Sequence, residues 1–274
     1  MPKTDLNSLS SALNLPSLNR LKSNSALYGY IRYILNFRKL KRSIASGELS
    51  SMPGSVKNFG KSRPILNEFL SAAGTASGHY FHQDLLVANH IYHHKPTVHL
   101  DIGSRIDGFI AHLLSFDQNT ILGDIRPVEF DNKNISFILM DLSGELDRSL
   151  LGRYESISCL HAIEHIGLGR YGDPVNAIGH YVALKNLSSL LSSSGTLYLS
   201  YPFGIKSRIE YNAHRVISLA ESRDMFYLNK LVARKFAYVN DAGNLVNVSK
   251  VADIDWDYSY HQKYGCAIWV LHKE

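Results

Sequence analysis

Three aspartates, each at the end of an apolar segment, give the first indication of chemistry in this chain. Asp101 ends the segment that begins at Thr97, Asp124 ends the next one, and Asp141 ends the third. The carboxyl ends of neighbouring parallel strands lie at one edge of a sheet, where open α/β folds bind their ligands. There Asp124 could accept hydrogen bonds from both ribose hydroxyls, and Asp141 could accept one from the adenine amine. The spacing therefore predicts a nucleoside-binding edge.

The turn after Asp101 distinguishes among nucleoside ligands. Turns that bind a dinucleotide hold its pyrophosphate against backbone N–H groups and have glycines throughout. A carboxylate at this strand end would repel a pyrophosphate, but it suits a cationic nucleoside such as S-adenosylmethionine (SAM), which carries an ammonium and a sulfonium group. A nicotinamide-dependent sugar oxidoreductase is an alternative that predicts glycine at position 105, where the sequence has Arg105.

Histidines follow the fourth apolar segment, in the string Cys159-Leu-His161-Ala-Ile-Glu164-His165. Removal of a proton from an acceptor hydroxyl needs a base, and an imidazole with a pKa of about 6.5 suits this task. On a helical turn His161 and His165 share one face, and we expect Glu164 to orient a neighbour. We predict His165 as the general base and His214 as the second candidate, while packing against cofactor or substrate is the alternative role of His165.

A glycine-rich loop, residues 167–174, combines a cation, an aromatic ring and an acid. We expect Arg170 and Tyr171 to contact the substrate, because an aromatic face and charge-assisted hydrogen bonds suit a sugar; a solvated loop tip is the alternative. Asp173 is predicted to join them or to cap the next helix, with Pro174 in its first turn.

Two further substrate contacts are predicted in the segments after the fifth apolar segment. Loops at the carboxyl edge of such a sheet line the site, and Tyr201 and Arg215 follow that segment. Ordinary loop packing is the alternative for both side chains.

The elements that position these residues alternate regularly. Strands are expected at 97–102, 119–123, 135–140, 156–160 and 195–200, with helices at 108–115, 144–151 and 176–192 between them. This order predicts an α/β fold with a doubly wound, mostly parallel, seven-stranded sheet. Residues 235–240 and 245–248 flank a turn and 266–272 form a last strand, so we expect the sheet to end in an antiparallel hairpin.

Residues 1–76 differ from the rest and are predicted to form a helical N-terminal extension to a domain of residues 77–274. We expect helices at 26–43, 65–73 and 80–91, and a loop at 47–63. Basic residues cluster between Arg32 and Arg42. A solvated helix end is one interpretation of this cluster, and a peripheral contact with a membrane or an acidic substrate is another.

Composition limits the remaining classes. The 274 residues, 45% of them hydrophobic, suffice for one α/β core and an extension. The two cysteines form no disulfide framework or zinc spacing, and the N-terminus resembles no secretory signal, so we predict a cytoplasmic protein. No basic and aromatic stripe indicates nucleic-acid binding. The oligomeric state stays open, and an oligomer remains an option.

The stretches 101–108, 123–127 and 161–174 resemble class I SAM-dependent methyltransferases. More narrowly, the string Gly-Leu-Gly-Arg-Tyr-Gly-Asp-Pro is similar to a little-characterised domain family of that fold, associated with surface-polysaccharide genes. The resemblance covers residues 76–201 well and implies SAM as cofactor and a sugar or glycan hydroxyl as acceptor. A divalent metal, for which Glu164, His165 and Asp173 could supply ligands, is not favoured.

The resemblance also assigns cofactor contacts. Tyr80 and Gln83 precede the first strand, where related enzymes cover the methionine end of the cofactor. Arg105 and Asp107 stand where the general pattern has glycines, so either the turn has another shape or Arg105 contacts the methionine carboxylate. The predicted cofactor-binding residues are Tyr80, Gln83, Asp101, Gly103, Ser104, Arg105, Asp124, Ile125, Arg126, Asp141, Leu142 and His161.

A binding module without catalysis remains a second function class. In this alternative the altered turn at Arg105 and Asp107 has lost turnover, and the basic N-terminal helix docks a partner or a membrane. Cofactor binding without methyl transfer would favour it.

Overall fold

The computed structural model describes residues 25–46 and 60–274, and its contacts divide the chain into two units, Met1–Thr75 and Ala76–Glu274. In the first unit, α3 (Ser25–Ala45) confirms the helix predicted at 26–43. The helix expected at 65–73 is wrong, because only the 3₁₀ turn η1 (Glu68–Leu70) forms there. Most of the loop predicted at 47–63 lies outside the described residues.

The basic cluster lies on α3. Its side chains from Arg38 to Arg42 are largely exposed, whereas Arg32 is partly buried with its guanidinium 5.8 Å from the centre of the Phe69 ring. Within residues 25–46 and 60–274, no helix combines the length and hydrophobicity that crossing a membrane requires.

The second unit is built on one sheet in the order β3-β2-β1-β4-β5-β10-β8-β9. Its strands are β1 (His99–Ile102), β2 (Thr120–Asp124), β3 (Ile135–Leu139), β4 (Tyr154–Leu160), β5 (Leu191–Phe203), β8 (Leu231–Val239), β9 (Leu245–Val248) and β10 (Gly265–Lys273). The first five strands pair in parallel, and β10 runs antiparallel between β5 and β8. The predicted fold class and the antiparallel end are confirmed, with β9 as an eighth strand.

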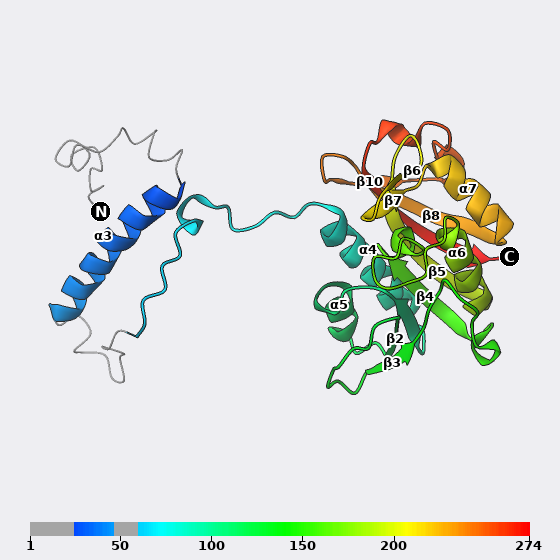
Figure 1. Ribbon diagram of the computed structural model, residues 1–274, viewed down its shortest axis with the longest axis horizontal. Coiled ribbons are helices and arrows are strands. Elements are labelled where there is room, and N and C mark those ends of the chain that lie inside the picture. The colour runs from blue at the N-terminus through cyan, green and yellow to red at the C-terminus, as the bar shows by residue number, and fades with distance from the viewer. Residues whose placement is uncertain (1–24, 47–59) are drawn as a thin grey trace. The chain divides into compact units, whose positions relative to one another are not determined.

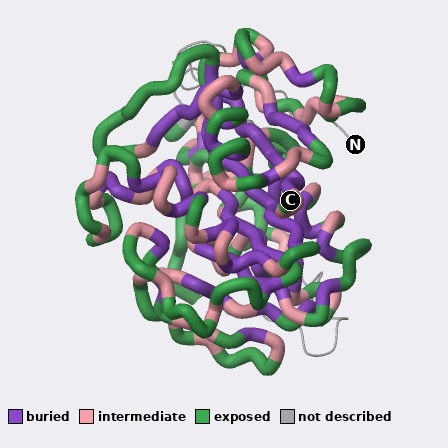
Figure 2. Tube along the Cα trace, turned by 90° about the vertical axis from the view of Figure 1, so that its right-hand side faces the viewer, coloured by how far each residue is buried: buried purple, intermediate pink, exposed green. Residues whose placement is uncertain are grey.

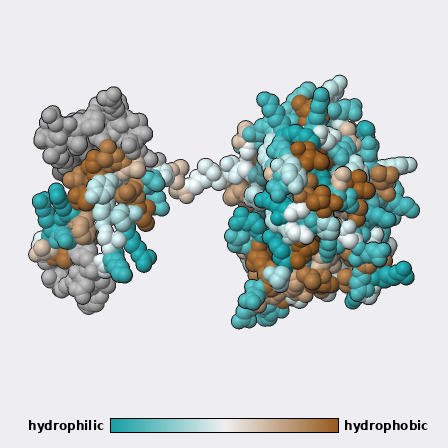
Figure 3. Space-filling view, viewed as in Figure 1, coloured by the Kyte–Doolittle hydropathy of each residue, from teal (hydrophilic) through white to brown (hydrophobic). Residues whose placement is uncertain are grey.

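Helices cover both faces of this sheet. One apolar core joins the strands to α4 (His79–His94), the π-helical turn η2 (Ile106–Ile110) and α5 (Ala111–Leu114). The other joins them to α6 (Gly179–Leu190) and α7 (Leu219–Leu228). Figure 2 shows the buried strands enclosed by exposed loops, and on the face in Figure 3 hydrophilic side chains surround separate apolar areas. Strands buried on both sides explain the continuous apolar segments of the sequence.

Two expectations about helices need correction. The helix predicted at 144–151 reduces to the 3₁₀ turn η3 (Arg148–Leu150), although Leu146 and Leu150 still pack against the core. The helix predicted at 176–192 begins only at Gly179 and ends at Leu190, where β5 takes over the chain. A small second sheet, β6 (Arg208–Glu210) with β7 (His214–Val216), follows β5.

Candidate active site

A cavity of about 660 Å³ opens at the carboxyl ends of the parallel strands, a size typical of small-molecule sites. Its lining comes from α4, the turns after β1, β2, β3 and β4, the glycine-rich loop, and the segments around His214 and Tyr264. Every residue predicted for the site lines this cavity except Asp101, Tyr201 and Arg215. The strand ends therefore converge as the sequence predicted.

Asp101 braces the first turn rather than facing the cavity. Its carboxylate is buried and accepts hydrogen bonds from the Ser104 backbone N–H, the Ser104 hydroxyl at 2.7 Å, and the Ser158 hydroxyl. Burial raises its pKa to about 6, against the effect of these hydrogen bonds. The expected direct attraction between Asp101 and a cationic ligand is therefore corrected to a structural role, which shapes the turn that lines the cavity.

The turn itself explains why Gly103 is needed. Its φ is +75°, and an added Cβ would lie 2.9 Å from the Ala162 side chain. Arg105 follows with an exposed side chain that pairs with Asp107 at 2.9 Å, so both charged residues that replace glycines lie at the solvent-exposed rim. The turn thus accommodates them without closing the cavity.

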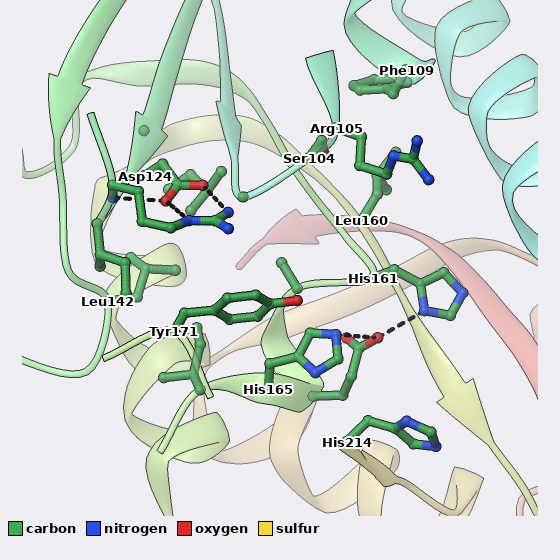
Figure 4. A pocket seen from close by; sticks show the side chains of 18 of the residues that line it. Ser104, Arg105, Phe109, Asp124, Leu142, Leu160, His161, His165, Tyr171 and His214 are labelled. Carbon is green, nitrogen blue, oxygen red and sulfur yellow. Dashed lines mark hydrogen bonds and ion pairs between the residues drawn. The ribbon is translucent and has the colours of Figure 1, made fainter. Parts of the chain in front are cut away.

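Acids at the ends of β2 and β3 face one end of the cavity. Asp124 accepts hydrogen bonds from the Arg126 backbone N–H at 2.9 Å and from its guanidinium at 3.0 Å (Figure 4). The guanidinium lies 4.6 Å from the centre of the Tyr171 ring. Asp141 accepts one bond from the Ser143 N–H at 2.7 Å, while Leu142 is buried beside it.

A buried carboxylate links the two predicted histidines of the fourth strand end. Glu164, in the 3₁₀ turn η4 (Ile163–His165), is 1% exposed, and its Oε1 lies 2.7 Å from His161 Nδ1 and 3.8 Å from His165 Nε2 (Figure 4). Burial lowers the pKa of His161, but interactions with Cys266 and Glu164 outweigh it and raise this pKa well above the ordinary value. Both histidines line the cavity through Glu164, not through one regular helical face.

His165 has the geometry of a neutral base. Its Nδ1 lies 2.7 Å from the Ala213 carbonyl oxygen, which can only accept, so Nδ1 carries the proton and Nε2 has a free lone pair. At 3.8 Å, Nε2 is too far from Glu164 for a hydrogen bond. Burial also lowers the pKa of His165, although Glu164 opposes the shift. An unprotonated Nε2 therefore lines the cavity near pH 7.

His214 lies nearby but is more engaged. Its Nε2 is 3.2 Å from the Glu210 carboxylate, and its ring is 6.4 Å from the His165 ring. A proton held between His214 and Glu210 leaves this nitrogen less available than that of His165. The order in which the sequence ranked the two bases agrees with this geometry.

The glycine-rich loop closes on itself around Asp173. Its carboxylate accepts hydrogen bonds from the N–H groups of Gly167 at 2.6 Å, and of Gly169 and Tyr171 at 3.3 Å. Because α6 begins only at Gly179, the expectation that Asp173 caps this helix is wrong. The closed loop presents Tyr171 and Arg170 to the cavity.

Arg170 and Tyr171 lie against the histidines. The Arg170 guanidinium donates to the Ala213 carbonyl at 2.8 Å, the oxygen that also holds His165. The Tyr171 ring meets the His165 ring edge-on at 5.5 Å and remains 37% exposed. An acceptor in this part of the cavity would therefore contact a phenol and a guanidinium.

Tyr201 and Arg215 have structural roles, which corrects their assignment to the substrate. Tyr201 is fully buried, and its hydroxyl donates to Ser222 at 2.7 Å. Arg215 is 3% exposed, and its shortest hydrogen bond, 2.6 Å, goes to the Ile166 carbonyl. Its guanidinium also donates to the backbone carbonyls of residues 164, 176 and 177. Arg215 thereby ties the histidine turn to the loop before α6.

Sequence reasoning missed three residues that line the cavity, His79, Asp84 and Tyr264. Asp84 is buried in α4, where Gln83 donates to it at 3.1 Å, and burial raises its pKa. The sequence signal for Asp84 was its place beside Gln83. His79 and Tyr264 carry no local signal, since their rings meet only in the folded chain, with centres 5.3 Å apart.

Comparisons with known proteins agree with this architecture. The family model described as "Caenorhabditis protein of unknown function, DUF268" matches residues 104–250. The search of curated proteins found no match to the sequence.

Two solved structures illustrate the fold. The 1,6-didemethyltoxoflavin-N1-methyltransferase of Burkholderia thailandensis, solved with 1,6-didemethyltoxoflavin and S-adenosylhomocysteine, is 14% identical with a TM-score of 0.50, and the match covers 70% of this chain and 78% of that chain. A SAM-dependent methyltransferase of Leishmania major is 14% identical with a TM-score of 0.47, covering 70% of this chain and 73% of that one. The first similarity, together with the strand order, shows the Rossmann-like methyltransferase fold.

Proposed function

The chain belongs to the DUF268 family, and we propose that it is a SAM-dependent O-methyltransferase whose acceptor is a hydroxyl of a sugar or glycan intermediate. The observation that carries the proposal is the unprotonated Nε2 of His165, which lies in a cavity whose other end presents Asp124 and Asp141. Surface-polysaccharide biosynthesis is the process suggested by the sequence resemblance.

The cavity residues fit SAM. Apolar side chains of Ile125, Met140 and Leu142 line the end beside Asp124 and Asp141, an arrangement suited to an adenine ring and its ribose. At the other end, the buried Asp84 carboxylate has a raised pKa because burial outweighs the hydrogen bond from Gln83. A cationic group, such as the ammonium of SAM, would stabilise the charged form of this carboxylate.

Binding of a ribose at Asp124 requires Arg126 to release its hydrogen bonds. The Arg126 side chain is 54% exposed. Ion pairs with one solvent-exposed partner typically contribute no more than about 1 kcal/mol, since water replaces the lost contacts. This exchange is therefore compatible with cofactor binding, and the released guanidinium can remain on the Tyr171 ring.

When bound, SAM supplies an electrophilic methyl group at its sulfonium. The chain supplies proton removal and orientation. His165 Nε2 accepts the hydroxyl proton, the bond from Nδ1 to Ala213 fixes the tautomer, and the Glu164 carboxylate stabilises the imidazolium that forms. Arg170 and Tyr171 orient the acceptor from the opposite side.

The test is calorimetric titration with S-adenosylhomocysteine, the demethylated product. We expect wild type to bind with a Kd well below 1 mM, and Asp124→Ala to bind at least 10-fold more weakly. Asp131→Ala is the matched control, because Asp131 is an exposed acid outside the cavity and its loss should change nothing. A wild-type Kd above about 1 mM, roughly −4 kcal/mol, would refute the proposal.

The acceptor is identified by mass spectrometry of methylated products from cells with and without the protein. A methylated sugar or glycan that depends on the protein supports the proposal. Cofactor binding without transfer to any acceptor would instead favour a binding module without catalysis.

A further inference from the structure

Three side chains on one side of the candidate active site bring potential metal ligands together. They are His79 at the start of α4, His161 after β4, and Cys266 at the start of β10. One nitrogen of each imidazole and the Cys266 sulfur all lie within 4.8 Å of one another. The cluster depends on the antiparallel return of β10 beside β5, where Cys266 pairs with Pro202.

His161 is oriented as a metal ligand commonly is. Its Nδ1 is held by the buried Glu164 carboxylate at 2.7 Å, which directs Nε2 away from Glu164. Within the described part of the chain, this buried Nε2 has no hydrogen-bond partner. A carboxylate behind a histidine is the usual outer-shell arrangement at zinc sites, where it fixes the ring and the tautomer. A buried, unsatisfied nitrogen aimed at two other ligand atoms is thus a second, independent indication of a ligand.

The chemistry of the three donors selects the class of ion. Two imidazoles and a thiolate suit Zn²⁺ or a similar borderline ion, whereas Mg²⁺ and Ca²⁺ require oxygen ligands. Three protein ligands with one open position is the composition of catalytic zinc sites. Ligand atoms around a tetrahedral ion lie roughly 3.5 Å apart, so the side chains need to close by only about 1 Å.

We propose that His79, His161 and Cys266 bind a zinc-type divalent ion. His79 and His161 line the cavity while Cys266 lies buried behind them, so the open coordination position faces the cavity. This set differs from the ligands that the sequence suggested, because Asp173 is bound to the backbone of its own loop.

The role of the ion rests on the proposed function. An acceptor hydroxyl in the open position would coordinate through its oxygen, which lowers the pKa of the hydroxyl. Its proton then passes to His165 Nε2, and the oxygen forms the new bond to the methyl group. Binding of the ion itself depends only on the three ligands.

The experiment uses the untagged full-length chain after dialysis against a chelator, titrated with Zn²⁺ and, for spectroscopy, with Co²⁺. We expect one equivalent of either ion per chain, with Co²⁺ giving tetrahedral d–d bands and a near-ultraviolet thiolate charge-transfer band. Cys266→Ser should remove the charge-transfer band and weaken Zn²⁺ binding at least 10-fold. Cys159→Ser is the matched control, because this other buried cysteine of the chain lies outside the cluster.

A second pair of variants covers the case in which Cys266→Ser fails to fold. His79→Ala, at a partly buried position of α4, should weaken Zn²⁺ binding at least 10-fold, while His93→Ala, exposed on the same helix, should not. The absence of stoichiometric binding, or equal binding in His79→Ala and wild type, would overturn the proposal. Titration with S-adenosylhomocysteine separates the two proposals, because the ion site can fail while cofactor binding persists, and the reverse.

Discussion

Replacing His165 by glutamine should abolish most methyl transfer while leaving the cofactor site intact. Glutamine has a similar size, and its amide can donate to the Ala213 carbonyl, to which His165 Nδ1 now donates at 2.7 Å. It cannot accept a proton at neutral pH. The substitution therefore removes the base and preserves the hydrogen bond that positions it.

The expected magnitude follows from the environment of the ring. A general base typically contributes about 10²- to 10⁴-fold to a rate. Burial lowers the pKa of His165, and a weaker base contributes less to proton transfer, so we expect a loss of about 10²- to 10³-fold in kcat. This loss corresponds to roughly 3–4 kcal/mol in the barrier.

The assay measures kcat and KM with the acceptor found by mass spectrometry, together with the affinity for S-adenosylhomocysteine. We expect the affinity of His165→Gln to stay within threefold of wild type. His214→Gln is the comparison, with a loss below 10-fold, because His214 already lies 3.2 Å from Glu210. If His165→Gln keeps more than a tenth of the turnover, the base assignment fails, and a large loss in His214→Gln would transfer the role to His214.

The same base predicts a pH profile. Since the pKa of His165 is lowered from 6.5, the ring is neutral above that value, and kcat/KM should fall with a slope of one proton as the pH drops through the lowered pKa. The groups that act on the ring are Glu164, Arg170, His161, Tyr171 and His214. His165→Gln should lack this acidic limb. A wild-type profile that stays flat down to pH 5 would contradict the assignment.

Two further predictions concern the frame of the site. Arg215→Met should lower the free energy of unfolding by about 3 kcal/mol in denaturant titrations, because buried backbone carbonyls such as that of Ile166 lose a charged donor; a loss below 1 kcal/mol would contradict this. For Asp101, a pKa raised from 3.8 to about 6 means that folding favours the protonated acid, so its contribution to stability is lost as the pH rises from 4 to 6. The stability of Asp101→Asn relative to wild type should therefore rise by roughly 3 kcal/mol over this range, and a constant difference would refute the shift.

The strands were predictable because burial on both faces leaves continuous apolar segments in the sequence. The helix α7 was not predicted, although Ser218 and Glu221 form an N-terminal capping box in which the Ser218 hydroxyl accepts from the Glu221 N–H. The helix expected at 144–151 failed for the opposite reason. Its apolar residues Leu146 and Leu150 do contact the core, but from an irregular loop.

Strand-end acids show the limit of pattern reasoning at the site. Asp101 and Asp124 follow equivalent strands, yet Asp101 turns inward because Ser104 offers it both a backbone N–H and a hydroxyl. Asp124 remains at the cavity, held by Arg126. Which donors follow an acid within two or three residues therefore decides its direction. His79 and Cys266 could not be paired from sequence at all, because they meet only through the return of β10.

One buried carboxylate connects the two proposals. Glu164 is 1% exposed, and its Oε2 has no hydrogen-bond partner within the described residues. An unpaired buried carboxylate lowers stability by several kcal/mol unless positive charge lies close to it. Its two neighbours supply that charge at different times. An ion on His161 would place it there permanently, and His165 would add a proton whenever an acceptor is deprotonated. The position of Glu164 between the two histidines is therefore the arrangement expected if one side binds a cation and the other exchanges a proton.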